Sequence, residues 1–197
     1  MAANDYQFVT KWRFDGTTIE EIDAILSKGE GLARWWPSVY LGVKKLEAGG
    51  PGGVGTRFEL DTQGWLPYRL RWSFVVTRAD HPRSFAIEAQ GDFVGHGEWT
   101  IAPVEGGKVD VTYVWTISAD KPLLKYLSFL FKPFFSLNHQ WAMERGREGM
   151  ELELRRRHGE QNVPAPRPPV PAWKSGGILL LVFGGAASVI WAIRNLL

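Results

Sequence analysis

His96 and His139 are the side chains whose chemistry best suits acid–base catalysis in this sequence. A histidine that acts as a general base needs a carboxylate partner, and the order of the chain suggests only Glu98 or Asp92. Strand alternation places His96 on the face opposite Trp99, where we expect it to be exposed to water. The sequence therefore shows no histidine–carboxylate pair suited to acid–base catalysis. Catalytic residues stay unassigned, and the pattern favours a binding protein over an enzyme.

Residues that could hold a metal or a cofactor are also scarce. The chain of 197 residues contains no cysteine, which excludes disulfides, thiolate metal sites and cysteine nucleophiles. Its four histidines lack the spacing of metal ligands, so we expect neither a metal nor a cofactor. The formal net charge is only +2, which argues against nucleic acid as a partner.

The stretch "EAGGPGGVGTRFELD" (Glu47–Asp61) raises a different possibility, a phosphate-binding loop, because five glycines fall within Gly49–Gly55. A phosphate loop leads into a helix whose free N–H groups face the anion. Here the loop leads into Thr56–Asp61, which alternates polar and apolar residues as a strand does. The preceding segment, Tyr40–Leu46, also has the pattern of a strand. The glycines are therefore predicted to join two strands.

The whole chain up to about residue 158 has the order strand, two short helices, six strands and one long helix. Thr17 and Glu20 are predicted to form a capping box at the first helix, and Pro133 to kink or split the last one. A long antiparallel sheet with its helices gathered on one face is an α+β fold. The predicted elements are the strand Tyr6–Phe14, the helices Thr17–Leu26 and Gly31–Trp36, the strands Tyr40–Leu46, Thr56–Asp61, Arg69–Thr77, Ser84–Gln90, Phe93–Ala102 and Val109–Ser118, and the helix Lys121–His158.

Four segments in this order resemble a known superfamily: "GEGLARWWPSV" (Gly29–Val39), "GGPGGVGTRFEL" (Gly49–Leu60), "GHGEWTI" (Gly95–Ile101) and "HQWAMERGREGMELELRRR" (His139–Arg157). Over residues 5–157 the chain resembles the START-like (SRPBCC) superfamily, which includes polyketide cyclase/dehydrase and coenzyme Q-binding proteins. The resemblance implies a helix-grip fold, with a curved seven-stranded antiparallel sheet around a long C-terminal helix. It also implies a cavity for hydrophobic molecules between sheet and helix, but no single reaction.

Strand and helix spacing identifies the residues that would face such a cavity. Ordinary core packing is the alternative for each of these side chains. Tyr113 and Asn138 are the polar members, which could orient a ligand or could instead satisfy a backbone group. The predicted ligand-binding residues are Phe58, Trp72, Phe85, Trp99, Tyr113, Trp115, Asn138 and Trp141.

The end of the chain is predicted to cross a membrane once. The 18 residues Gly176–Ile193 carry no charge. As a helix they would span about 27 Å, close to the ~30 Å hydrocarbon core of a bilayer. Basic residues precede this segment at Arg155–Arg157, Arg167 and Lys174, whereas only Arg194 follows it. The large N-terminal domain is therefore expected on the cytoplasmic side of the cell membrane.

Within the predicted span, Gly184 and Ser188 form a small-xxx-small pair that could support a weak homodimer. Ahead of the span, Asn162–Ala172 contains five prolines and is predicted to be an extended spacer. The predicted parts are residues 1–158 as a START-like hydrophobic-ligand-binding domain, 159–173 as a proline-rich linker and 174–197 as a transmembrane anchor.

Three functions remain open on this basis. The apolar character of the predicted cavity favours a membrane-anchored carrier or sensor of a lipid or other hydrophobic small molecule. The alternative from a different class is an enzyme that resembles a polyketide cyclase or dehydratase. A third possibility is an interaction module whose cavity is collapsed.

Overall fold

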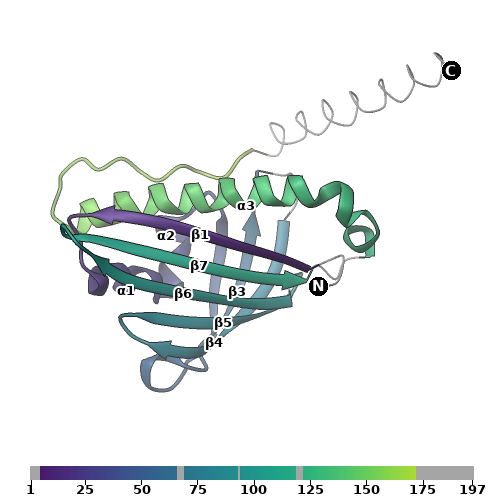
Figure 1. Ribbon diagram of the computed structural model, residues 1–197, viewed down its shortest axis with the longest axis horizontal. Helices are drawn as coiled ribbons and strands as arrows, with labels where there is room; N and C mark the ends of the chain where they lie inside the picture. The colour runs from purple at the N-terminus through teal and green to yellow at the C-terminus, as the bar shows by residue number, and fades with distance from the viewer. Residues whose placement is uncertain (1–4, 66–68, 93, 119–121, 172–197) are drawn as a thin grey trace, which may run out of the picture.

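The computed structural model describes residues 5–65, 69–92, 94–118 and 122–171. It confirms the predicted α+β helix-grip arrangement, with seven antiparallel strands and one long C-terminal helix (Figure 1). The elements are β1 (Asp5–Asp15), α1 (Ile19–Leu26), the 3-10 turn η1 (Gly29–Gly31), α2 (Leu32–Trp35), β2 (Tyr40–Glu47), the 3-10 turn η2 (Pro51–Gly53), β3 (Arg57–Gln63), β4 (Arg69–Asp80), β5 (Ser84–Gly91), β6 (Val94–Val104), β7 (Lys108–Ser118) and α3 (Pro122–Arg157).

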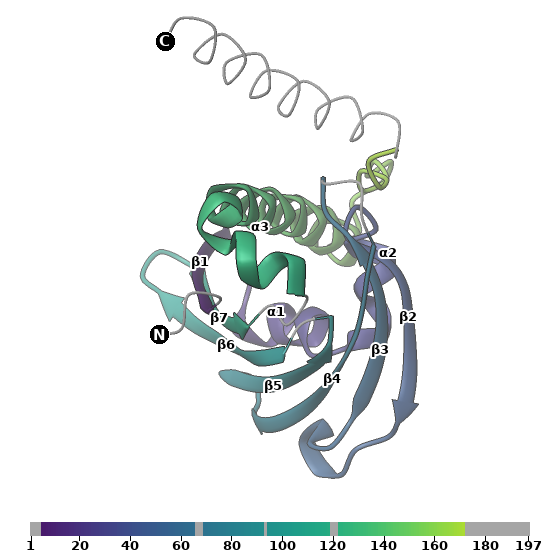
Figure 2. The ribbon, with the colours of Figure 1, turned by 90° about the vertical axis from the view of Figure 1, so that its right-hand side faces the viewer.

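The strands form one sheet in the order β1-β7-β6-β5-β4-β3-β2, and every neighbouring pair is antiparallel. The sheet curves around the space beneath α3 (Figure 2). The two ends of the sheet are called the proximal end and the distal end. At the proximal end β3 stops at Gln63, β6 starts at Val94 and β7 stops at Ser118, shortly before α3 begins. At the distal end lie the β2–β3 and β6–β7 connections.

The glycine-rich stretch joins β2 and β3, as predicted. Gly52, Gly53 and Gly55 have positive φ angles of 67°, 81° and 87°, which residues with side chains rarely adopt. A Cβ at Gly49 would lie 2.5 Å from the backbone nitrogen of Thr56, so the two arms of the connection approach closely. The stretch therefore shapes a turn and does not open a helix for phosphate.

The capping box of α1 lies one residue later than predicted. Thr18, and not Thr17, is the N-cap: its hydroxyl accepts from the Glu21 backbone at 3.3 Å, and the Glu21 carboxylate accepts from the Thr18 backbone at 3.0 Å. The hydroxyl of Thr17 donates to the same carboxylate at 2.9 Å. Both threonines thus hydrogen-bond to Glu21. Thr18 is the N-cap because its backbone is still extended and Ile19 is the first helical residue.

Helix α3 is one continuous element through Pro133, although its first turns bend away from the axis of the rest (Figure 2).

The C-terminal half of α3 approaches α2 very closely. A Cβ at Gly149 would lie 2.0 Å from the carbonyl oxygen of Trp35, and one at Gly146 would lie 2.5 Å from the ring of Trp36. Glycine at these positions lets the helix rest directly on the two tryptophans.

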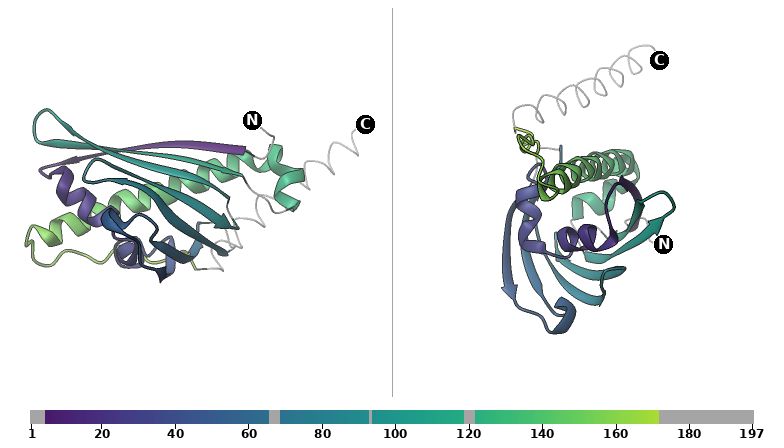
Figure 3. Two further views of the ribbon diagram at one scale, coloured as in Figure 1. Left: turned by 90° about the horizontal axis from the view of Figure 1, so that it is seen from below. Right: turned by 90° about the vertical axis from the view of Figure 1, so that its left-hand side faces the viewer.

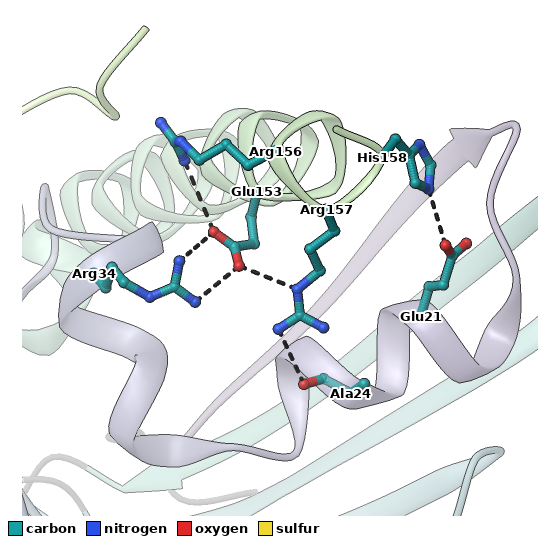
Figure 4. A network of polar contacts seen from close by, with 7 residues as sticks. All are labelled: Glu21, Ala24, Arg34, Glu153, Arg156, Arg157 and His158. Atoms are coloured by element: carbon teal, nitrogen blue, oxygen red, sulfur yellow. Dashed lines mark hydrogen bonds and ion pairs between the residues drawn. The ribbon is translucent and has the colours of Figure 1, made fainter. Parts of the chain in front are cut away.

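A buried carboxylate joins the same two helices (Figure 4). Glu153 is 4% exposed, and Arg34 of α2 donates to both of its oxygens, with one contact at 2.8 Å. Arg157 donates to it at 3.1 Å, and Arg156 lies 3.8 Å away. Burial by itself would raise the pKa of Glu153, but the hydrogen bonds and charges of Arg34 and Arg157 together hold that pKa below its ordinary value.

The proline-rich segment packs against the domain and does not project from it as a spacer. Residues 159–171, here called the strap, run back beside α3 (Figure 1). Arg156 donates to the carbonyl of Pro164, Arg167 lies 3.4 Å from Glu148, and Gln63 donates to the carbonyl of Val170 at 2.9 Å. Proline-rich backbone has no internal hydrogen bonds, so its carbonyls are free to accept from these neighbours.

Several predictions for the C-terminus lie outside the described residues: the anchor 174–197, the span Gly176–Ile193 and the pair Gly184 and Ser188. Within the part of the chain that the structure describes, no helix has both the length and the apolar character needed to cross a bilayer.

Glu153→Gln is expected to lower the free energy of unfolding by about 1–3 kcal/mol at neutral pH, because it weakens a buried, charge-assisted network. The pKa of Glu153 is lower in the folded chain, so its contribution is present above the ordinary value of 4.5 and fades as the pH falls further. Thermal unfolding of both proteins from pH 7 to pH 3 measures this difference.

The matched control is Glu160→Gln, because Glu160 pairs with Arg155 on the surface, where both side chains are 46% exposed. We expect a much smaller change for the control, because solvent screens an ion pair on the surface. Equal effects of the two substitutions, or an effect of Glu153→Gln that grows toward pH 3, would contradict the assignment of the network.

Candidate functional site

A cavity of about 590 Å³ lies between the inner face of the sheet and α3. Its lining reaches the proximal end at Gln63, Asn138 and His139, and the distal end at Gly52 and His81. The cavity therefore follows the length of the strands. Its volume falls within the range of roughly 300–1,000 Å³ that is typical of small-molecule sites.

Aromatic rings from neighbouring strands form one wall of the cavity. Trp99 of β6 and Tyr113 of β7 are paired across the two strands and stack with their ring centroids 4.0 Å apart. Tyr113 is 5.8 Å from Trp115, and Trp115 is 5.9 Å from Trp72 on the other side of the curved sheet. Period-two alternation puts these rings on one face, and the curvature of the sheet brings them together.

The cavity lining includes seven of the eight residues predicted from the sequence. Trp141 is the exception: it is half-buried on α3 and lies outside the lining. The helix presents Phe135, Asn138, His139 and Ala142 to the cavity, so the true face is rotated from the one predicted. Which of the lining residues contact a ligand remains a prediction.

Gly97 leaves space for the aromatic wall and not for a ligand. A Cβ at this position would lie 2.8 Å from the hydroxyl of Tyr113 and 2.9 Å from the ring of Trp115. Gly95 is equally constrained, since its Cβ would lie 2.1 Å from the carbonyl oxygen of Thr116 on β7. These two glycines let β6 and β7 pack with large rings on the same face.

Asn138 fixes the connection that follows β3. Its side-chain oxygen accepts from the backbone of Trp65 at 3.0 Å, and a Cβ at Gly64 would lie 2.0 Å from that same oxygen. Gly64 thus lets the backbone pass directly against the amide. Of the two roles predicted for Asn138, the structure assigns the satisfaction of a backbone group, at a position that also lines the cavity.

His139 lies beside Asn138 in a largely apolar setting. Its Nε2 is 3.2 Å from the hydroxyl of Thr10, and its ring stacks on Phe8 with centroids 4.3 Å apart. Burial lowers the pKa of His139 from 6.5 to about 4, so the imidazole is neutral at physiological pH. A neutral imidazole on an apolar wall is a weak base and a good hydrogen-bonding group.

The carboxylates predicted as partners of His139 lie elsewhere. Glu98 pairs with Arg78, and Asp92 accepts from the backbone of Arg71 at 2.9 Å. His96 is exposed, as predicted. In the portion of the chain that the structure describes, no three histidine or acidic side chains gather as potential metal ligands.

Two phenols supply further polar groups, one on the buried Tyr113 and one on the half-buried Tyr40. Burial raises the pKa of Tyr113, with the neighbouring Tyr40 adding to the rise, and burial also raises the pKa of Tyr40. Both hydroxyls therefore stay protonated and can donate to a ligand oxygen. The sequence did not identify Tyr40 as a cavity residue. The pairing of β2 with β3 is irregular between Tyr40 and Gly42, and such a bulge interrupts the alternation of inward and outward side chains.

The distal end of the cavity has a charged rim, which the sequence also did not reveal. Lys45 contacts Glu30 at 2.9 Å, and His81 lies 2.7 Å from Asp23 and 3.1 Å from the carbonyl of Gly52. These residues come from five separate segments, so no local motif marks them. The rim differs from the proximal end, where Phe8, Phe135 and neutral polar groups line the cavity.

Solved structures share this fold at low sequence identity. The protein TTHA0849 from Thermus thermophilus superposes with a TM-score of 0.61 at 18% identity, over 76% of this chain and 99% of that one. A START superfamily protein from Mycobacterium smegmatis gives 0.57 at 16% identity, over 75% and 98% of the two chains. The di-domain ARO/CYC protein BexL of the BE-7585A biosynthetic pathway gives 0.53 at 12% identity, over 76% and 51%. These likenesses concern the fold alone.

Sequence comparison identifies the family. Comparison with curated protein sequences finds no significant match. The family described as polyketide cyclase / dehydrase and lipid transport matches residues 10–155, which is well over half of the chain. The protein therefore belongs to the polyketide cyclase / dehydrase and lipid transport family.

Proposed function

We propose that this domain binds a hydrophobic small molecule, such as a lipid or an isoprenoid, and holds it as a carrier or sensor at the membrane. The observation that carries the proposal is the cavity of about 590 Å³ with an aromatic wall. At roughly 25 cal/mol per Å², a ligand that buries about 300 Å² gains about 7 kcal/mol before ordering costs. The apolar surface thus supplies affinity, and the phenols of Tyr113 and Tyr40 supply orientation.

The two ends of the cavity support an amphiphilic ligand. Lys28, Lys45 and His81 line the distal end, and Phe8 and Phe135 line the proximal end. A polar group is better solvated beside the distal rim, where Lys45 pairs with Glu30, whereas an apolar chain is better placed against the rings. The proposed ligand therefore has its polar group distal and its apolar part proximal.

Membrane anchoring is the second part of the proposal. It is supported by the 18 uncharged residues Gly176–Ile193 and by the basic residues that precede them. With this anchor, the protein belongs in the cell membrane with its large domain in the cytoplasm. A cavity for apolar molecules then lies close to the phase in which such molecules dissolve.

An enzyme that resembles a polyketide cyclase or dehydratase is the second candidate. It is favoured by a neutral imidazole, His139, which lines the same cavity as the protonated hydroxyls of Tyr113 and Tyr40. Such donors could polarise a ligand carbonyl. The pKa of about 4 for His139 weighs against it, because a base this weak removes protons poorly.

A titration of the purified protein with fatty acids, isoprenoid quinones and sterol-like probes tests binding through the tryptophans of the cavity. Saturable binding of at least one class is expected, with a Kd in the micromolar range or below. Ala142→Trp places a large side chain on the cavity face of α3 and is expected to weaken binding at least tenfold.

The matched control is Ala102→Trp, the same substitution at an exposed position of β6 outside the cavity lining. It should leave the affinity unchanged, and thermal unfolding should show that both variants are folded. Failure of every ligand class to bind, or equal losses of affinity in the two variants, would rule out the cavity as the binding site. Turnover of a polyketide-like substrate would favour the second candidate.

Carbonate extraction of cell membranes tests the anchor. The full chain should stay in the membrane fraction, because a spanning helix resists alkaline extraction. A chain ending at Pro171 should appear in the soluble fraction. Protease added to the cytoplasmic side of sealed vesicles should degrade the large domain. Release of the full chain by carbonate, or a domain protected from cytoplasmic protease, would contradict the proposed topology.

The pKa of His139 predicts how stability depends on pH. The unfolded chain protonates this imidazole near pH 6.5 and the folded chain only near pH 4, so acidification across this window favours unfolding. His139→Gln should remove about 3 kcal/mol of the stability lost between pH 7 and pH 4. Urea unfolding at several pH values measures it, with exposed His96→Gln as the control. An unchanged pH dependence in His139→Gln would show that the imidazole is not buried as neutral.

A further inference from the structure

The first turns of α3 have an unusual composition for the start of a helix in a water-soluble domain. Pro122–Leu137 reads "PLLKYLSFLFKPFFSL", with ten leucine, phenylalanine and tyrosine residues, two lysines and no acidic residue. Lys125 and Lys132 are its charges, and the next acidic residue along the chain is Glu144. Apolar and aromatic residues interspersed with lysine are typical of helices that lie in the interface of an anionic membrane.

The fold places this segment at the proximal end of the cavity. Helix α3 begins shortly after β7 stops at Ser118, and its first turns bend away from the rest of the helix (Figure 2). Apolar side chains are exposed at the same end: Leu137 of α3 is 54% exposed and Val94 at the start of β6 is 42% exposed. Phe135, two residues before Leu137 on α3, lines the cavity. The apolar surface and the cavity therefore meet at one end.

The strap brings the chain back to this end. From Asn138 to Arg157, α3 covers about 28 Å, a distance that the strap can retrace at about 3.1 Å per residue. The strap runs back along α3 in Figure 1, and the left panel of Figure 3 shows it at a right angle to that view. It arrives at Gln63, whose side chain lines the cavity and donates to the carbonyl of Val170 at 2.9 Å.

The position of Val170 limits where the apolar C-terminal segment can begin. Gly176 follows Val170 by six residues, which span at most about 20 Å. A membrane helix that begins there starts within that distance of Gln63 and of the proximal cavity lining. Without the strap, the same helix would follow the C-terminus of α3, at the distal end of the sheet.

We propose that the strap and the first turns of α3 form a membrane-docking face that holds the proximal end of the cavity against an anionic lipid bilayer. This inference rests on the proposed function, since it makes the bilayer the source or destination of the hydrophobic ligand. The apolar end of the cavity then faces the lipid, and the charged rim around Lys28, Lys45 and His81 faces the cytoplasm. A ligand whose polar group lies at the rim moves between the cavity and the membrane with its apolar part leading.

The absence of cysteine in the chain allows a direct test with single-cysteine labels. Leu137→Cys and Val94→Cys report on the proximal end. Leu46→Cys and Val54→Cys are matched controls, because these side chains are also apolar and are 44% and 40% exposed at the distal end. Each full-length variant is labelled with an environment-sensitive fluorophore and reconstituted in vesicles of phosphatidylcholine and phosphatidylserine that contain a lipid-borne nitroxide quencher.

The proximal labels should emit at shorter wavelength and be quenched at least threefold more than the distal labels. Equal quenching at the two ends, or stronger quenching at the distal end, would overturn the proposal. Proximal labels that are shielded from water but not quenched by lipid would also overturn it, and would indicate that a second copy of the chain covers this face.

Two further variants separate the contributions of the strap and of the helix. Replacement of residues 163–171 by a Gly-Ser sequence of equal length should reduce the difference between the ends to less than twofold. Lys125→Glu combined with Lys132→Glu should reduce quenching at Leu137→Cys, more in anionic than in purely phosphatidylcholine vesicles. Lys44→Glu combined with Lys108→Glu, on the distal half, is the matched control and should have no effect.

The label experiment contains no ligand, so its failure is distinct from failure of ligand binding, and carbonate extraction of the same vesicles separates loss of the anchor from loss of docking. Loss of ligand binding in the titration would leave the docking result standing, whereas insensitivity of the labels to both variants would overturn docking and leave ligand binding standing. A correct fold in each variant is checked by its thermal unfolding in detergent.

Discussion

The close contact between α3 and the pair Trp35 and Trp36 is the constraint on which the cavity depends. Gly146 and Gly149 remove the side chains that would keep the helix away, and Glu153 then ties it to Arg34. This contact pins the C-terminal half of α3 to α2. The other half must cross a sheet whose inner face carries large aromatic rings, so it cannot settle onto the strands, and the space that remains is the cavity.

The regular parts of the sheet could be predicted from the sequence because a strand has one strict period. Alternation correctly placed Phe58, Trp72, Phe85 and Trp115 on the inner face, since β3 to β7 pair with few irregularities. The prediction that Trp141 faces the cavity was wrong, because α3 has polar and apolar residues on most sides and so no single apolar face. Tertiary contacts at Gly146 and Gly149 set the rotation of the helix about its axis. The charged rim could not be predicted, since its members meet only in the fold.

The polar groups of the cavity mostly hold the protein together. Asn138 accepts from the backbone of Trp65, and Thr62 accepts from the Trp72 indole at 3.0 Å while donating to the Leu70 carbonyl at 3.3 Å. Groups that are already satisfied have little capacity left for a substrate. The phenols of Tyr113 and Tyr40 are protonated donors, so the cavity offers shape, aromatic faces and a few hydrogen-bond donors.

The strap links the two features that the sequence presented as independent, the ligand-binding domain and the proline-rich segment. A spacer that projected from the distal end would leave the orientation of the cavity to rotation about a free tether. A strap fixed by Gln63, Arg156 and Arg167 has already lost that freedom in the folded domain, so the membrane docking proposed above requires no further ordering of this segment. Because polyproline carbonyls accept hydrogen bonds without rearrangement, a proline-rich sequence suits this path along the surface of α3 better than a flexible one.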